Sequence, residues 1–101
     1  MATCCNCSNK GLFLRTNKQG VCKTCQPTVA AEIDKHSEVI YEEMHVHERS
    51  VEKADKLSAC DRLLESAEIL VKYENWGYET CSPPAKLVLD EYRGFRTELT
   101  D

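Results

Sequence analysis

Glycine and proline are scarce in this sequence of 101 residues, and no long apolar run is present. Four glycines and three prolines exclude a collagen-like or low-complexity chain, because such chains are rich in these residues. No apolar stretch approaches the ~20 residues that a transmembrane helix needs. The first residues also lack the basic and apolar regions of a signal peptide. We therefore expect a cytoplasmic protein, built as one domain or as a small module with a helical extension.

Acidic and basic residues are unevenly distributed along the chain, which has a formal net charge of −4. Residues 1–28 hold four basic residues and no acidic one, whereas residues 29–101 hold nine basic and seventeen acidic residues, a balance of −8. Such asymmetry is typical of chains in which one end binds a polyanion such as nucleic acid. Four zinc-bound thiolates would offset half of this N-terminal positive charge, and the acidic remainder would repel nucleic acid. The basic side chains available to contact phosphate are Lys10, Arg15, Lys18 and Lys23.

Seven cysteines are present, and five of them fall within the first 25 residues. Two Cys-x-x-Cys pairs are separated by fourteen residues, and the two-residue spacing lets both sulfurs of a pair point into one turn. Two such turns place four thiolates at the corners of a tetrahedron, which suits Zn²⁺. Because four thiolates fill the coordination shell, we expect the zinc to be structural rather than catalytic. The predicted ligands are Cys4, Cys7, Cys22 and Cys25.

The register of the first cysteine pair is open, because Cys5-x-Cys7 can also supply two ligands. The two-residue spacing favours Cys4 with Cys7 and leaves Cys5 as a spare thiol. A disulfide framework is disfavoured by the odd number of cysteines and by the missing signal peptide. A thioredoxin-like redox motif is disfavoured because no parallel-sheet pattern flanks the second pair.

The segment between the cysteine pairs predicts a β-hairpin. Gly11–Arg15 is a short, mostly apolar run, residues 16–20 are rich in turn formers, and Val21–Cys22 returns toward the first pair. A knuckle, a hairpin and a cysteine pair at the start of a helix resemble the treble-clef and zinc-ribbon groups of zinc fingers, over about residues 4–35. The resemblance implies zinc binding. It leaves the function open, because such modules bind DNA, RNA, proteins or nothing at all.

A long helical pattern follows the second cysteine pair. No glycine or proline occurs from Thr28 to Trp76, and apolar residues recur at steps of three and four, as on one face of a helix. Near residue 54 this stripe shifts, as a stammer shifts it in a coiled coil. Basic residues just before Ser50, and Ser50 itself as an N-cap, favour a break there. We therefore favour helices over residues 28–48 and 51–75 that pack as a helical hairpin. One long helix that needs a partner is the alternative.

The last third of the sequence predicts a loop and a short helix. Gly77 is typical of a helix stop, and Ser82-Pro83-Pro84 is typical of a helix start with serine as the cap. The fold class we expect is therefore mainly α, with a small N-terminal four-cysteine zinc-binding β-hairpin. We divide the chain into a zinc-binding knuckle and hairpin over residues 1–28 and a helical region over residues 29–101, which packs with it or extends from it.

No catalytic constellation is evident from the spacing of polar residues. His45 and His47 point to different faces of a helix, neighbouring carboxylates do the same, and no glycine-rich phosphate loop is present. We expect Cys60 in the core and Cys81 as a loop thiol. We therefore predict a non-enzymatic interaction module whose zinc fixes the N-terminal part. Its helices would present an amphipathic or acidic face to a protein partner or to a second copy of the chain.

Three alternatives remain beside that interpretation. The first is a nucleic-acid-binding zinc-finger module, in which the basic N-terminal residues contact phosphate and Asn17 or Gln19 touches bases. The second is a thiol-redox or metal-donor role for the clustered cysteines, which predicts labile zinc. The third is an accessory domain of a larger protein whose activity lies elsewhere.

Overall fold

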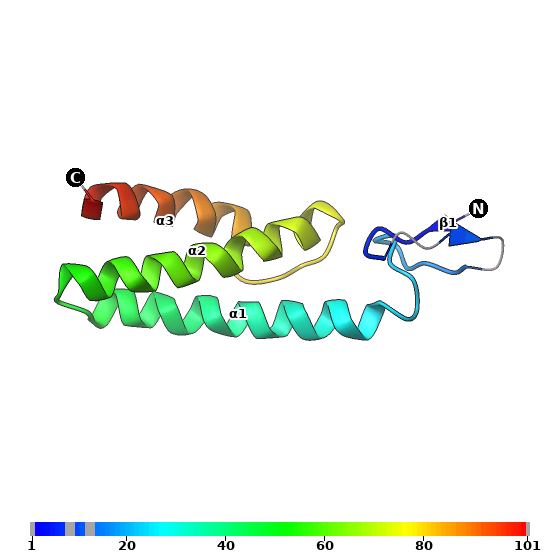
Figure 1. Ribbon diagram of the computed structural model, residues 1–101, viewed down its shortest axis with the longest axis horizontal. Helices are drawn as coiled ribbons and strands as arrows, with labels where there is room; N and C mark the ends of the chain where they lie inside the picture. Colours follow the sequence, from blue (N-terminus) through cyan, green and yellow to red (C-terminus); the bar gives the residue numbers. More distant parts are fainter. Residues whose placement is uncertain (1, 8–9, 12–13, 101) are drawn as a thin grey trace.

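The computed structural model describes residues 2–7, 10–11 and 14–100, and within these residues the chain forms three helices and two short strands. In Figure 1, α2 lies between α1 and α3, and the N-terminal strands lie beyond one end of the helices. The molecule measures 55 × 21 × 18 Å along its principal axes. None of the three helices combines the length and apolar content required to cross a bilayer. The elements are β1 (Ala2–Thr3), β2 (Lys10–Gly11), α1 (Gln26–Arg49), α2 (Lys53–Asn75) and α3 (Ala85–Thr100).

The first two helices are separate, so the predicted helical hairpin is confirmed and the single long helix is wrong. Ser50 adopts an extended conformation (φ −73°, ψ 136°), and its backbone N–H donates to the Val46 carbonyl at 2.9 Å. The Ser50 hydroxyl donates to the same carbonyl at 2.6 Å. Ser50 therefore caps the end of α1, whereas the sequence predicted that it would cap the start of α2. The N-cap of α2 is Glu52, whose side chain makes no capping bond.

The core lies between α1 and α2 and between α2 and α3. Cys60 has no exposed surface, which confirms its predicted core position. His36 of α1 is half-buried, and its Nδ1 lies 3.0 Å from the Ser66 hydroxyl of α2. Truncating a fully buried leucine in such a core costs about 2–5 kcal/mol. The fully buried apolar side chains of the helices include Val29, Ile40, Leu63, Leu70 and Val88.

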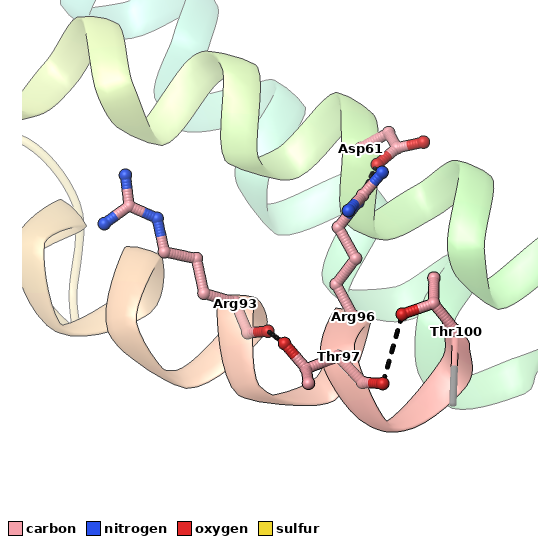
Figure 2. A network of polar contacts seen from close by, with 5 residues as sticks. All are labelled: Asp61, Arg93, Arg96, Thr97 and Thr100. Carbon is pink, nitrogen blue, oxygen red and sulfur yellow. Dashed lines mark hydrogen bonds and ion pairs between the residues drawn. The ribbon is translucent and has the colours of Figure 1, made fainter.

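An exposed ion pair also joins α2 and α3. The Arg96 Nε donates to the Asp61 carboxylate at 2.6 Å (Figure 2). Within α3, the Thr97 and Thr100 hydroxyls donate to the backbone carbonyls of Arg93 and Thr97. Because both ionic side chains are about half exposed, such a pair contributes only about 0–1 kcal/mol. Apolar burial therefore supplies most of what holds α3 in place.

The start of α3 is capped by a carboxylate from α2. The backbone N–H groups of Ala85 and Lys86 donate to the two carboxylate oxygens of Glu74, at 2.7 and 3.1 Å. The Thr80 hydroxyl also donates to Glu74. The backbone N–H of Ser82 instead donates to the Tyr41 hydroxyl at 2.9 Å. The prediction that Ser82 caps this helix is wrong, because α3 begins three residues later and takes its cap from a distant side chain.

The N-terminal part has little regular β-structure among the described residues. β1 and β2 pair in an antiparallel ladder, and one isolated bridge joins Thr16 and Cys22. The outer strand of the predicted hairpin, Gly11–Arg15, includes Leu12 and Phe13, which lie outside the described residues. The hairpin therefore stays a prediction, as does the division of the chain at residue 28.

Candidate metal centre

Four cysteine sulfurs converge in the N-terminal part of the chain. All four Sγ atoms lie within 4.8 Å of one another, and the Cys7 and Cys22 sulfurs are 3.8 Å apart. In a tetrahedral site with Zn–S bonds of about 2.3 Å, neighbouring sulfurs are about 3.8 Å apart. The spacing therefore fits sulfurs that share one ion, and each of these thiols is free of a disulfide. The residues, named the four-cysteine cluster below, are Cys4, Cys7, Cys22 and Cys25.

The second cysteine pair lies on a helical turn that continues into α1. The backbone N–H groups of Cys25 and Gln26 both donate to the Cys22 carbonyl, at 3.0 and 3.1 Å. The Val29 N–H then donates to the Cys25 carbonyl at 2.9 Å. Pro27 occupies the first turn, where its missing N–H has no intrahelical partner to lose. The helix therefore fixes the directions of these two sulfurs.

The first cysteine pair is held by the loop that precedes the second. Cys4 is fully buried, and its sulfur accepts the backbone N–H of Cys22 at 3.2 Å. The backbone N–H of Cys5 donates to the Gly20 carbonyl at 2.9 Å. Gly20 has φ +81°, a conformation that residues with a Cβ rarely adopt. A glycine at this turn therefore brings the two cysteine pairs together.

Cys5 takes no part in the four-cysteine cluster. Its thiol is exposed and donates to the backbone carbonyls of Gln19 and Gly20, at 3.3 and 3.2 Å. Cys4, its neighbour, is the residue that lies beside the other three sulfurs. This grouping of sulfurs agrees with the register that the two-residue spacing favours.

The protonation of the cluster shows why it suits a cation. Burial raises the pKa of the Cys4 thiol. Hydrogen bonds from the backbone N–H groups of Cys22, Cys7 and Asn6 outweigh this effect and lower the pKa to about 6. The side chain of Asn6 lowers the pKa of Cys25, but Cys22, burial and the other cluster thiols raise it to about 12. Neighbouring thiolates also repel one another, so burial and like charge together oppose deprotonation of all four cysteines. A divalent cation removes this conflict, because it stabilises the deprotonated form of every ligand.

The predicted phosphate-contacting residues are partly described. Arg15, Lys18 and Lys23 are exposed on the N-terminal part of the chain. Lys10 lies in β2, where only its backbone is described. Three of the four predicted basic side chains are therefore accessible to an anion such as phosphate.

Asn17 has a structural role that the sequence analysis missed. Its side-chain oxygen accepts the backbone N–H groups of Gln19 and Val21, at 3.1 and 3.0 Å. Its side-chain nitrogen donates to the Tyr78 hydroxyl at 2.7 Å. Asn17 thus forms three bonds within the protein, and the alternative in which Asn17 or Gln19 touches bases stays untested. The turn-rich sequence around Asn17 indicated the local bonds, but nothing indicated a partner 61 residues away.

Comparison with known proteins adds no relative. No protein-family model matches the chain, and neither the curated proteins nor the solved structures gave a significant match. The structure thus shows a mainly helical protein with four cysteines placed to hold a metal ion. The likeness to treble-clef and zinc-ribbon fingers therefore rests on the sequence pattern of residues 4–35, and no family or fold match supports it.

Proposed function

We propose that the protein is a non-enzymatic interaction module, built around a structural zinc ion held by the four-cysteine cluster. The observation that carries this proposal is the convergence of the four sulfurs within 4.8 Å. Four thiolates complete a tetrahedral zinc shell and leave no open position for a substrate. The ion would act by fixing the knuckle and the start of α1, in the manner of a treble-clef or zinc-ribbon finger.

The helices supply the surface that such a module would present. The region after residue 28 carries the −8 charge balance, and most of its acidic side chains are exposed. The N-terminal part is linked to this helical region by the bond between Asn17 and Tyr78. Zinc would therefore set the position of the N-terminal part relative to an acidic helical face. A protein partner or a second copy of the chain would bind the surface formed by the N-terminal part and the acidic helical face together.

The structural role of zinc is tested by recording backbone amide spectra of the protein before and after treatment with a zinc chelator. We expect the amide signals of Cys4–Cys25 to lose dispersion, while most signals of α2 and α3 persist. Unchanged signals after complete zinc removal would contradict a structural role and favour the metal-donor alternative. Re-addition of zinc should restore the original spectrum, which excludes irreversible thiol damage as the cause.

Nucleic-acid binding is a second candidate, which the exposure of Arg15, Lys18 and Lys23 favours. Three phosphate contacts would give a plot of log K against log salt with a slope of about −3. We expect no such binding to duplex DNA or single-stranded RNA at about 150 mM salt, because the acidic helices repel phosphate. Tight binding with that slope, lost on changing Lys18 to Gln, would favour the second candidate over the first.

A further inference from the structure

A cleft opens beside the loop that joins α2 to α3. Its volume is about 750 Å³, within the range of pockets that bind ligands or anchor side chains. Tyr41 of α1 and Leu87 of α3 form two of its walls, and residues 78–82 of the loop form another. Figure 1 shows this loop returning from the end of α2 to the start of α3. The cleft therefore lies where three separate elements meet, far from the four-cysteine cluster in sequence.

The walls of the cleft expose apolar surface. Among the described residues, three large hydrophobic side chains stand out as exposed: Tyr41, Val51 and Leu87. Two of them border the cleft, with exposed fractions of 42% for Tyr41 and 58% for Leu87. Packing within the fold leaves these surfaces uncovered. A partner that inserts an apolar side chain between them would bury that area.

The borders of the cleft are acidic on each side. Glu79 lies in the wall itself. Glu38 precedes Tyr41 by three residues on α1, and Glu91 follows Leu87 by four residues on α3, so each shares a helix face with an apolar wall residue. All three carboxylates are exposed. Lys86 is the one cation among the residues that line the cleft.

Acidic side chains also lie near Tyr92, where side chains of α1 and α3 contact each other. After burial, the charges of Glu91 on α3 and Glu48 on α1 both raise the pKa of Tyr92. The same ring packs edge-on against His47 of α1, with ring centroids 5.3 Å apart. Carboxylates from both helices therefore lie near the point where α1 and α3 meet.

We propose that this cleft and its acidic borders bind a cationic amphipathic peptide segment of a partner protein. An apolar side chain of the segment would insert between Tyr41 and Leu87. Its lysine or arginine side chains would lie against Glu38, Glu79 and Glu91. This is the helix-in-groove mode, in which anchors at helical spacing give affinity and charges select the partner. The proposal rests on the proposed interaction function and names the chemistry of the partner.

Other occupants fit the charge pattern less well. A symmetric dimer through this face would bring the acidic borders of two copies together, because a two-fold interface uses the same surface patch of both subunits. Like charges placed opposite each other disfavour that arrangement. Nucleic acid is disfavoured for the same reason. A cationic segment is the occupant that both the apolar walls and the carboxylates favour.

The test uses a labelled synthetic peptide of about 15 residues, made of lysine and alanine with leucines at helical spacing. A matched peptide carries glutamate in place of every lysine. We expect fluorescence anisotropy to detect binding of the cationic peptide alone to the zinc-loaded, full-length protein. Amide shifts caused by that peptide should cluster around Tyr41, Leu87 and residues 79–82, and should spare the four-cysteine cluster.

Matched pairs of variants distinguish binding in the cleft from nonspecific hydrophobic or electrostatic binding elsewhere on the surface. Leu87→Ser should weaken binding about tenfold, as expected for loss of a central apolar contact. Val51→Ser, at the exposed apolar residue outside the cleft, should leave the affinity unchanged. Glu79→Gln should weaken binding about twofold at low salt, whereas Glu65→Gln, at an exposed position of α2, should not. All four positions are exposed in the fold, so a matched melting temperature verifies that each variant is folded.

Three results of the peptide and variant experiments would overturn the proposal. They are equal binding of the cationic and acidic peptides, shifts that map away from the cleft, and equal effects of Leu87→Ser and Val51→Ser. A dimer that Leu87→Ser dissociates would likewise overturn it in favour of a second copy. Zinc content is measured by native mass spectrometry on the same sample. A zinc-loaded monomer without peptide binding would refute this inference alone, whereas loss of zinc would refute the proposed structural metal.

Discussion

Neighbouring cysteines can have opposite environments, as Cys4 and Cys5 do. Cys4 is fully buried and lies with three other sulfurs, whereas the exposed thiol of Cys5 bonds to backbone carbonyls. Cys5 lies in the turn after β1, where its thiol and its backbone N–H both bond to the loop that precedes the second cysteine pair. Adjacent residues of the same type therefore have different predicted roles, one as a zinc ligand and one as a spare thiol.

Cys4→Ser and Cys5→Ser form a matched pair of variants that tests this assignment. Changing an outer-shell partner of a metal typically costs about 10–100-fold in affinity, and loss of a direct ligand should cost more. We expect Cys4→Ser to weaken zinc binding by at least that amount, and Cys5→Ser to leave it unchanged. Competition with a chromogenic chelator measures both affinities. Equal losses, or a larger loss for Cys5→Ser, would contradict the ligand register.

The cysteine spacing predicted which sulfurs converge, because a two-residue separation constrains both sulfurs of a pair locally. It did not resolve Cys4 against Cys5. That choice depends on the Gly20 turn and on the Cys22 backbone N–H, which reach the first pair from elsewhere in the chain. Local spacing thus identifies the kind of site, and longer-range bonds decide its register.

At the scale of helices, ends are set by contacts that cross between elements. The first turn of α3 receives its cap from Glu74, which lies at the end of α2. A carboxylate at this position satisfies unpaired N–H groups and interacts favourably with the helix dipole. The same side chain also holds Thr80 in the connecting loop. Glu74 therefore couples the end of one helix to the start of the next.

Replacing Glu74 with Ala should destabilise the protein by about 1–2 kcal/mol, the cost of losing a helix cap. Glu68→Ala is the matched control, because Glu68 forms only an exposed ion pair with Arg93 and should contribute little. Urea unfolding of the zinc-loaded variants measures both changes. Similar stabilities of the two variants would show that Glu74 does not cap α3.

The lowered pKa of His47 indicates that the stability of the protein depends on pH. Burial lowers the pKa of His47 below its usual value of 6.5, nearby Lys56 lowers it further, and Glu48 opposes them. The unfolded chain then binds more protons than the folded one between the two pKa values. The free energy of unfolding therefore falls as pH drops through about 6.5. Contacts of the ring with Tyr92 and Phe95 place this effect at the α1–α3 junction.

The variant His47→Phe should lose less stability than the parent protein between about pH 7.5 and pH 5.5. His45→Phe is the control, since His45 is exposed on the same turn and should keep the parent slope. Protonation of the cysteines affects all three proteins alike, so the difference in melting temperature isolates His47. A parent-like slope for His47→Phe would refute this assignment.

The sequence predicted helix existence well and helix ends less well. The apolar period and the absence of glycine and proline identified α1 and α2, because such patterns are local. The sequence predicts N-caps at Ser50 and Ser82 from their residue type and their immediate neighbours. The structure uses Ser50 at the end of α1, and it begins α3 beyond Ser82 because Glu74 supplies the cap.

At the scale of the whole molecule, the N-terminal part and the helices form one connected structure. Val21 and Cys4 belong to the same buried cluster as side chains of α1 and α2. The bond between Asn17 and Tyr78 adds a polar contact across this junction. Such a contact between residues far apart in sequence could not be predicted, because no local pattern specifies the partner.

Asn17→Ala should destabilise the zinc-loaded protein by about 1–3 kcal/mol, since it leaves two backbone N–H groups and the Tyr78 hydroxyl without their partner. Tyr78→Phe removes only the bond across the junction and should cost less. Chemical unfolding of both variants gives the difference. Equal losses of stability in the two variants would mean that the bonds from Asn17 to the Gln19 and Val21 backbone contribute nothing in addition to the bond with Tyr78.

The zinc site is tested most directly by native mass spectrometry of protein purified without chelator, compared with the mass of the denatured chain. We expect one zinc ion per chain, retained in the folded state and released on denaturation. A metal-free chain whose mass is short by pairs of hydrogens would mean that the cysteines form disulfides. That result would contradict the four-cysteine zinc site, on which the proposed function depends.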